Sequence, residues 1–194
     1  MPNLSVEYMG LKLKNPLIAA SSGLTDSVEG IKRLAENGAA AVVLKSLFEE
    51  EILMEIEQNL KKMSRDTFQY PETVDFYEHD EHDDESTLKY LELISEAKKA
   101  VDIPIIASIN CVTADEWTYF PKRIQEAGAD ALELNVFILP TDFSRNADDN
   151  EKIYFDIIKE VKKQVTIPIS LKISPYFSSL GQMLQKLSGS GVNS

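Results

Sequence analysis

Runs of apolar residues alternate with amphipathic segments along most of this chain. The apolar runs lack polar alternation, as is typical of strands buried on both faces of a parallel sheet; they cover residues 16–20, 39–44, 103–109, 131–137 and 167–173. Between them, apolar residues recur at helical spacing over residues 27–37, 88–100, 113–127, 151–164 and 177–187. Strands that alternate with helices predict an α/β protein with a parallel sheet built from βαβ units.

Turn and cap residues mark the first elements. The apolar runs 4–8 and 11–13 flank Met9-Gly10, which predicts a small opening hairpin. Ser27 is a suitable N-cap for the first helix, and Gly38 stands just past its end, where a left-handed residue commonly terminates a helix. We therefore expect a hairpin followed by the first βα unit.

A weak internal repeat favours a barrel. Residues 102–105 (DIPI) are echoed by residues 166–169 (TIPI), an offset of 64. Two βα units per 64 residues is a period that a TIM (β/α)8 barrel could carry four times, although a doubly wound sheet could show it by chance. The chain holds about five βα units and the start of a sixth strand at Val192, whereas a full barrel typically needs about 250 residues. We expect residues 1–194 to form a single incomplete TIM-barrel domain, the first part of a longer protein, with an open edge at each end of its sheet.

One segment, at about residues 47–87, does not follow the βα rhythm. It is far longer than an ordinary strand-to-helix loop, and long loops on this fold are usually functional. We expect a helix over residues 49–63, an acidic run over residues 78–85, and a location at the mouth of the active site. His79 and His82 could chelate a metal, but the acidic run has no apolar anchor, so a solvated loop is the better interpretation.

Composition narrows the functional classes. Twenty Lys and Arg against 32 Asp and Glu give a net charge of −12, which disfavours a nucleic-acid partner. The single Cys111 excludes a disulfide framework. No apolar run approaches a membrane span, and the N-terminus lacks signal-peptide features, so we expect a cytoplasmic protein with no membrane partner.

Polar side chains follow or interrupt the apolar runs at their C-terminal ends, where the active site of a barrel lies. They include two lysines and two asparagines, Lys45, Asn110, Asn135 and Lys172, and the first run is followed by Ser22 and Gly23. A buried amide or ammonium needs a partner, and each could simply reach the rim or pair with a carboxylate such as Glu133. Amides and cations that converge at one end of a sheet also suit a flat polar heterocycle that carries negative charge.

Several of these segments resemble the dihydroorotate dehydrogenases, particularly the soluble fumarate-linked class. The resemblance spans the chain except for the insert, and it is carried by residues 15–16, 22–23, 45–46, 108–110, 123–125, 133–135 and 171–177. It implies an FMN-dependent TIM-barrel oxidoreductase that oxidises a dihydropyrimidine in pyrimidine biosynthesis. It also implies a small-molecule substrate, and we expect a homodimer.

The resemblance assigns roles to the same polar residues. Ser22 and Gly23 would approach the flavin with backbone groups, and Lys45 would lie against the isoalloxazine and the substrate. Asn110 and Asn135 would hydrogen-bond flavin or substrate amides, and Lys172 would sit at the polar edge of the flavin. Lys45 and Asn135 are the implied catalytic residues, and loops after strands seven and eight of a full barrel would hold the phosphate.

The substrate side departs from the family pattern. Ile138 stands where the family places a Cys or Ser base, with apolar Phe137 and Leu139 beside it, which we expect to keep the position dry. The Asn-rich substrate loop after strand two is not visible in the insert. Asp142, Thr141 and Cys111 are possible replacement bases, with rim or loop positions as the simpler interpretation of each.

Two rival functions stay open. One is a flavin-binding paralogue without catalysis, which the absent base would favour. The other is a barrel lyase that uses Lys172 as a Schiff-base nucleophile. A flavin absorbance spectrum and borohydride trapping separate these alternatives.

Overall fold

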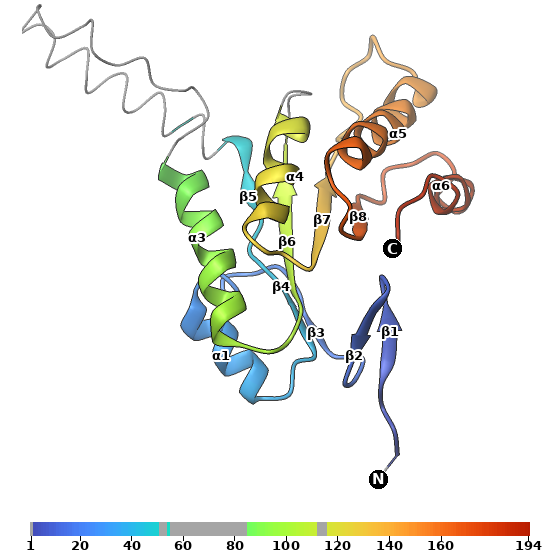
Figure 1. The fold of residues 1–194 in the computed structure, drawn as a ribbon. Helices are drawn as coiled ribbons and strands as arrows, with labels where there is room; N and C mark the ends of the chain where they lie inside the picture. The colour runs from blue at the N-terminus through green and yellow to red at the C-terminus, as the bar shows by residue number, and fades with distance from the viewer. Residues whose placement is uncertain (1, 51–53, 55–84, 112–115) are drawn as a thin grey trace, which may run out of the picture.

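Strands and helices alternate along the chain in the computed structural model, which describes residues 2–50, 54, 85–111 and 116–194 (Figure 1). The elements, in chain order, are β1 (Val6–Tyr8), β2 (Leu11–Leu13), β3 (Ile18–Ala19), α1 (Val28–Glu36), β4 (Ala41–Val43), β5 (Leu47–Phe48), α3 (Glu85–Ala100), β6 (Ile105–Asn110), α4 (Glu116–Glu126), β7 (Ala131–Val136), α5 (Ala147–Gln164), β8 (Ile169–Ile173) and α6 (Leu180–Ser188).

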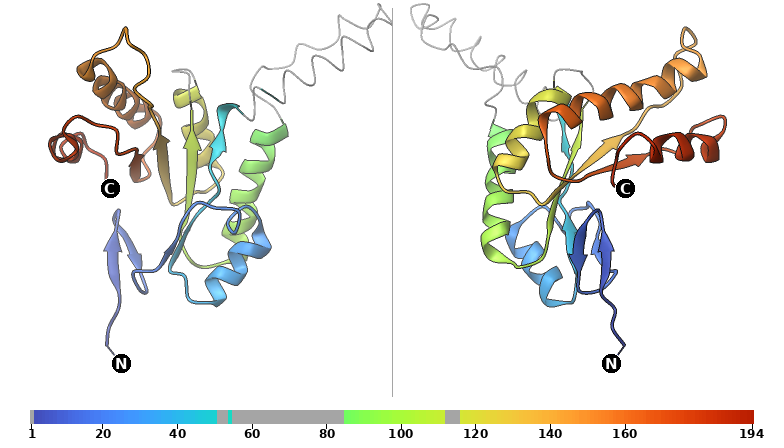
Figure 2. Two further views of the ribbon diagram at one scale, coloured as in Figure 1. Left: turned by 180° about the vertical axis from the view of Figure 1, so that it is seen from behind. Right: turned by 45° about the vertical axis from the view of Figure 1, so that its right-hand side comes forward.

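The main sheet is parallel and curled, with helices along its outer side (Figures 1 and 2). Its strand order is β3-β4-β6-β7-β8, and the short β5 pairs with β6 beyond the end of β4. The order follows the sequence without the reversal that defines a doubly wound sheet, so each new strand extends the curl in one direction. This arrangement is part of a TIM barrel, which confirms the predicted fold class.

The two faces of the sheet have different partners because alternate residues of a strand point to opposite sides. Val42 and Ile105 belong to the large core that the strands form with the helices. Val43 and Ile106, on the opposite face, pack instead with Met9 of the hairpin turn. We call this second face the inner face; the hairpin closes it at the N-terminal end of the strands.

The predicted hairpin and first helix are confirmed. Met9 and Gly10 form the turn between β1 and β2 with φ of 55° and 77°, the positive values that a two-residue turn of type I′ requires. The Ser27 hydroxyl accepts a hydrogen bond from the Gly30 N–H and caps α1, and Gly38 follows the helix with φ of 100°.

The internal repeat has a structural counterpart at the start of two strands. The Ile105 N–H donates to Oδ2 of Asp130 at 2.7 Å, and the Asp130 N–H donates to the Ile105 carbonyl at 2.9 Å. The same exchange joins Ile169 and Asn193, with distances of 2.9 Å to the Asn193 Oδ1 and 2.7 Å to the Ile169 carbonyl. Residues near Asn193 therefore run beside β8, as the expected start of a sixth strand would, although no strand is assigned there.

Several boundaries differ from the sequence prediction for local reasons. Helix α5 begins at Ala147 rather than at 151, because Asn146 and Asp149 form a reciprocal capping box. Helix α6 begins at Leu180 rather than at 177, because the Phe177 N–H bonds to the Pro175 carbonyl in a turn and Ser179 is the N-cap. Strand β5 was not predicted, so the irregular segment starts after it. The helix predicted over residues 49–63 lies mostly outside the described residues.

Candidate functional site

The inner face changes from apolar to polar toward the C-terminal ends of the strands. Beyond Ile106 on the same face comes Ser108, which is in register with Glu133 of β7. Glu133 is in turn level with Ser170 of β8, and Asn135 is level with Lys172. The hairpin covers the apolar end, so the polar end is where a small molecule could meet side chains from several strands.

Five polar side chains form a continuous row across this end of the sheet, joined by three hydrogen bonds and one ion pair. Oγ of Ser21 lies 3.3 Å from Oγ of Ser46, which lies 2.8 Å from Oγ of Ser108. The Ser108 hydroxyl donates to Oε1 of Glu133 at 2.9 Å, and Nζ of Lys172 lies 3.0 Å from the same oxygen. We call Ser21, Ser46, Ser108, Glu133 and Lys172 the polar row. It links residues from the ends of β3 and β4 to β6, β7 and β8.

A buried tyrosine supports the centre of the row. Val43 pairs with Ile106 of β6, and Leu47 pairs with Ile109, so the β4–β5 side has one more residue between these pairs than β6 has. This extra residue forms a bulge, and the backbone of Ser108 therefore has no strand partner on that side. The Tyr90 hydroxyl of α3 fills this position: it accepts from the Ser108 N–H at 2.8 Å and donates to the Ser108 carbonyl at 2.9 Å. Burial, with a smaller contribution from the charge of Glu133, raises the pKa of Tyr90 well above its ordinary value.

The loop after β3 is held against the loop after β4. The Thr25 hydroxyl is buried; it donates to the Ser22 carbonyl and accepts from the Ser22 N–H. The Thr25 carbonyl accepts from the Lys45 N–H at 3.3 Å, and Oγ of Ser21 accepts from the Ser46 N–H at 3.0 Å. The structure therefore brings Ser22, Gly23 and Lys45 together at one end of the polar row.

Two of the remaining predicted site residues, Asn135 and Lys172, lie at the other end, and Asn110 lies between the two ends on β6. Asn135 and Lys172 are neighbours across β7 and β8, and Lys172 has the carboxylate partner that the sequence offered for it, Glu133. Asn110 ends β6 and lines a pocket of about 480 Å³ together with Cys111 and Ile138. The polar row thus connects the loops that bear Ser22, Gly23 and Lys45 to Lys172 and its neighbour Asn135, whereas Asn110 lines a separate pocket.

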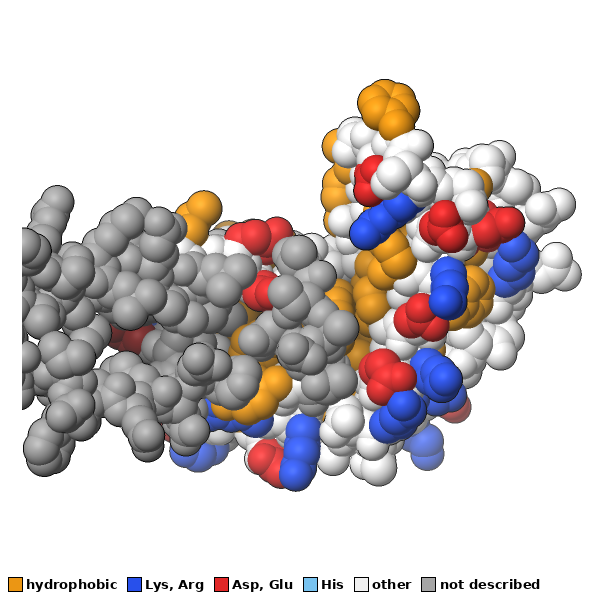
Figure 3. All heavy atoms as spheres, turned by 90° about the horizontal axis from the view of Figure 1, so that it is seen from above, with side chains coloured by type: hydrophobic (Ala, Val, Ile, Leu, Met, Phe, Trp, Pro, Cys, Tyr) orange, Lys and Arg blue, Asp and Glu red, His pale blue; other side chains and the backbone are white. Residues whose placement is uncertain are grey.

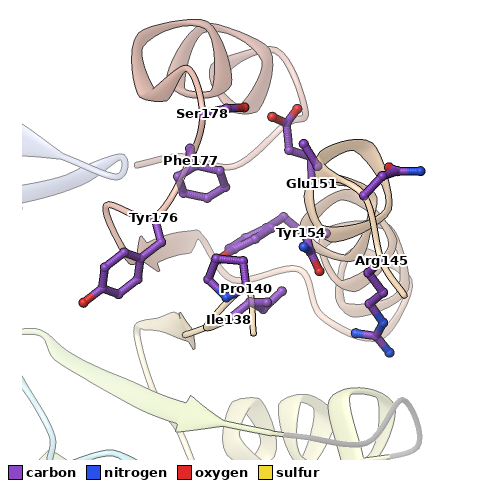
Figure 4. Close-up of a pocket in the computed structure, with 11 residues that line it drawn as sticks. Ile138, Pro140, Arg145, Glu151, Tyr154, Tyr176, Phe177 and Ser178 are labelled. Carbon is purple, nitrogen blue, oxygen red and sulfur yellow. The ribbon is translucent and has the colours of Figure 1, made fainter. Parts of the chain in front are cut away.

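Ile138, at the position where the resemblance places a base, lies on the helix side of the sheet. Ile138 is half-buried against the large core and lines a second pocket, of about 260 Å³, beside Pro140 and Tyr154 (Figure 4). Phe137 and Leu139 are 57% and 53% exposed within residues 1–194. They leave the strand after Val136, where the alternation that would bury them ends. Hydrophobic side chains are exposed among charged ones on this end of the molecule (Figure 3).

Of the alternative bases, Asp142 and Thr141 lie in an exposed loop, and Cys111 lines the pocket beside Asn110. Asp142 is exposed, and Ser144 donates to its Oδ1 from both its backbone N–H, at 2.9 Å, and its hydroxyl, at 2.6 Å. These hydrogen bonds, with the nearby charge of Arg145, hold the pKa of Asp142 below its usual range, which makes it a weaker base. Thr141 is exposed in the same loop, and Cys111 is half-buried against the core.

Sequence reasoning gave no role to Ser21, Ser46, Ser108 or Tyr90. A signal existed for Ser108 and Glu133, because both break apolar strands at the period-two spacing that also places Asn110 and Asn135 on the inner face. No signal existed for Tyr90, whose hydroxyl position depends on how α3 packs on the sheet.

The metal interpretation falls on His79 and His82, which lie outside the described residues. Among the residues that the structure does describe, no group of three or more His, Cys, Asp or Glu side chains could hold a metal ion. None of the helices in the described part of the chain has the length and apolar character needed to cross a membrane.

A curled parallel sheet with helices outside, a closed N-terminal end and polar residues at the C-terminal strand ends defines the β/α-barrel class of proteins. The solved structure of phosphonopyruvate hydrolase in complex with oxalate and Mg²⁺ matches this fold with a TM-score of 0.54, at 14% identity, over 92% of this chain and 56% of that one. Within that class, the chain belongs to the dihydroorotate dehydrogenase family, whose model matches residues 3–188.

Two archaeal relatives share this family. The catalytic subunit of dihydroorotate dehydrogenase B (NAD(+)) from Thermoplasma volcanium is 29% identical over 188 residues, and the subunit of the same description from Thermoplasma acidophilum is 28% identical over 185 residues. Each alignment covers 93% of this chain but 57% of the relative, so the chain spans little more than half the length of these relatives. Both are described as NAD(+)-linked, whereas the sequence motifs resemble the fumarate-linked class of the same family.

Proposed function

We propose that this chain contributes the flavin-facing residues of an FMN-dependent oxidoreductase. The observation that carries the proposal is the row of donors along the inner face. Asn135 and Lys172 lie side by side on β7 and β8. Lys172 forms an ion pair with Glu133, and hydrogen bonds through Ser108 connect Glu133 to Ser46 in the loop that bears Lys45. Membership of the dihydroorotate dehydrogenase family supports the same proposal.

The residues fit the chemistry of a flavin. An isoalloxazine ring offers carbonyl oxygens and ring nitrogens in one plane, and it gains negative charge when it is reduced. Amide side chains can donate to and accept from such atoms, and fixed ammonium groups stabilise the charge. Ser22, Gly23, Asn110, Asn135 and Lys172 would hold the ring, and the bound flavin would supply a hydride acceptor.

Lys45 and Asn135 are the residues we assign to catalysis. Lys45 follows β4, and its backbone is fixed by the Thr25 carbonyl, so its ammonium starts from a defined point at the rim of the inner face. It would lie between flavin and substrate and stabilise charge that develops during hydride transfer. Asn135 would orient a substrate amide beside it.

The substrate would be a dihydropyrimidine or a compound with similar amide edges. Oxidation of dihydroorotate needs a base that removes a carbon-bound proton while hydride leaves, and such a base contributes about 10²–10⁴-fold. Ile138 has no titratable group, and the Asp142 carboxylate is already engaged by Ser144 and Arg145. We therefore propose a substrate other than dihydroorotate, or a very slow reaction with it.

The Schiff-base lyase is the weaker alternative. A Schiff-base lysine must present a free amine to a carbonyl carbon, whereas Nζ of Lys172 is 3.0 Å from a carboxylate oxygen of Glu133. No described feature favours the lyase over the flavin enzyme. The paralogue that binds flavin without catalysis shares the proposed cofactor and differs only in turnover.

The test is the absorption spectrum of the full-length purified protein, before and after addition of FMN or FAD. With FMN we expect the absorbance of bound flavin at about 450 nm. We expect weak binding of FAD, because the chain has no Gly-rich dinucleotide fingerprint. A protein that binds neither flavin would refute the proposal, and borohydride trapping of Lys172 with a carbonyl compound would support the lyase instead.

A further inference from the structure

We propose that Glu133 is a positioning residue that holds the Lys172 ammonium in place for the cofactor, an inference that rests on the proposed function. Oε1 of Glu133 is shared by two donors, the Lys172 ammonium at 3.0 Å and the Ser108 hydroxyl at 2.9 Å. The Glu133 side chain is only 14% exposed, whereas that of Lys172 is 45% exposed. The carboxylate is therefore the fixed member of the pair and the lysine is the member that reaches outward.

The surroundings of Glu133 explain why it is fixed. Ser108 is fully buried, and its backbone is held on both sides of the residue by the Tyr90 hydroxyl. The Ser108 hydroxyl is also bonded to Ser46, so its orientation is set from the β4 side. Because the Glu133 carboxylate accepts a hydrogen bond from this fixed hydroxyl, it has few alternative positions. The Lys172 ammonium that pairs with the carboxylate is restricted in the same way.

A long lysine side chain otherwise has many rotamers, and ordering them opposes ligand binding. With Glu133 present, the ordering has already taken place in the folded protein, so the ammonium is pre-organised for a flavin. Glu133 would not touch the flavin; it would act through Lys172. This predicts that the effect of removing Glu133 disappears when Lys172 is absent.

The experiment measures the dissociation constant of FMN for the full-length protein and its variants by flavin fluorescence. Glu133→Gln is expected to weaken FMN binding about tenfold, the effect of losing the partly buried ion pair that orders the lysine. Lys172→Met is expected to weaken it at least as much, and Glu133→Gln should cause no further loss in the Lys172→Met background.

The chain offers a matched control. Glu151 of α5 and Lys186 of α6 are also 3.0 Å apart, and the Glu151 side chain is 15% exposed, but neither residue belongs to the polar row; Glu151 lines the pocket beside Ile138 on the helix side. Glu151→Gln should therefore leave FMN binding unchanged. If Glu133→Gln does not fold, as judged by thermal unfolding, Ser108→Ala removes the hydrogen bond to the carboxylate without a change of charge and should weaken binding about threefold.

The outcomes are distinguishable. FMN binding by the parent with an unchanged dissociation constant in Glu133→Gln and Ser108→Ala would overturn the inference alone. An equal loss from Glu133→Gln with and without Lys172 would also overturn it, because Glu133 would then act independently. A parent protein that binds no FMN would refute the proposed function and this inference with it.

Discussion

Replacement of Tyr90 by Phe removes one hydroxyl that serves two buried backbone groups. In the parent this hydroxyl accepts from the Ser108 N–H at 2.8 Å and donates to the Ser108 carbonyl at 2.9 Å. Phe keeps the ring in the core but leaves both groups without their partner at a position that is fully buried. Each unsatisfied buried group costs about 1–3 kcal/mol, so we expect Tyr90→Phe to lower the free energy of unfolding by about 2–4 kcal/mol near neutral pH.

The pH dependence of that difference follows from the raised pKa of Tyr90. In the folded protein burial keeps the phenol neutral, whereas in the unfolded chain it ionises near its ordinary value of 10.0. The stability that Tyr90 contributes is therefore fully present below pH 10 and is lost as the pH rises above that value. Each further pH unit lowers the advantage of the parent over Tyr90→Phe by up to about 1.4 kcal/mol.

Urea unfolding of the full-length parent and variant, followed by circular dichroism at pH 7.5 and at pH values above about 10, measures both effects. Tyr176→Phe is the matched control, because this tyrosine is exposed and its loss of a hydroxyl should change stability by less than about 0.5 kcal/mol. A Tyr90→Phe variant as stable as the parent would refute the bridging role, as would a difference that stays constant above pH 10.

Three further outcomes are expected. Lys45→Met should slow flavin reduction about 100-fold with whichever substrate reduces the parent, and equal rates by stopped flow would remove Lys45 from catalysis. Excess dihydroorotate, mixed anaerobically with the parent, should bleach the flavin far more slowly than about 1 s⁻¹, and faster bleaching would show that a base has been overlooked. Asn193→Ala should lower the free energy of unfolding by about 1 kcal/mol, because it removes the acceptor of the Ile169 N–H; an unchanged urea midpoint would contradict this.

Periodic patterns in the sequence determined the class of fold. Apolar runs without alternation marked β4, β6, β7 and β8, because strands buried on both faces need no polar residues. Local chemistry also predicted the Met9-Gly10 turn and the Ser27 cap, since both depend on residues only a few positions apart. The motifs of residues 133–135 and 171–177 were sufficient to indicate the dihydroorotate dehydrogenase family.

Boundaries were less predictable where a side chain outside the periodic pattern decides them. The capping box of Asn146 and Asp149 starts α5 before its apolar face begins. Strand β5 is two residues long, and it exists because the bulge after β4 returns the chain to the edge of β6. Neither feature leaves a hydrophobic signature that is long enough to recognise.

The candidate site also has features that the sequence predicted and features that depend on the tertiary structure. The residue types and the strand ends that carry Lys45, Asn110, Asn135 and Lys172 were readable in the sequence, because polar residues inside apolar strands stand out. The sequence offered Glu133 as a carboxylate partner, but the tertiary structure alone decided that it pairs with Lys172 rather than with another polar residue, and that Ser46 and Ser108 connect the pair to the loop after β3. It also decided that Tyr90 replaces a missing strand neighbour. These contacts depend on strand register, on a one-residue bulge and on the packing of α3, which act between residues far apart in sequence and which no local pattern encodes.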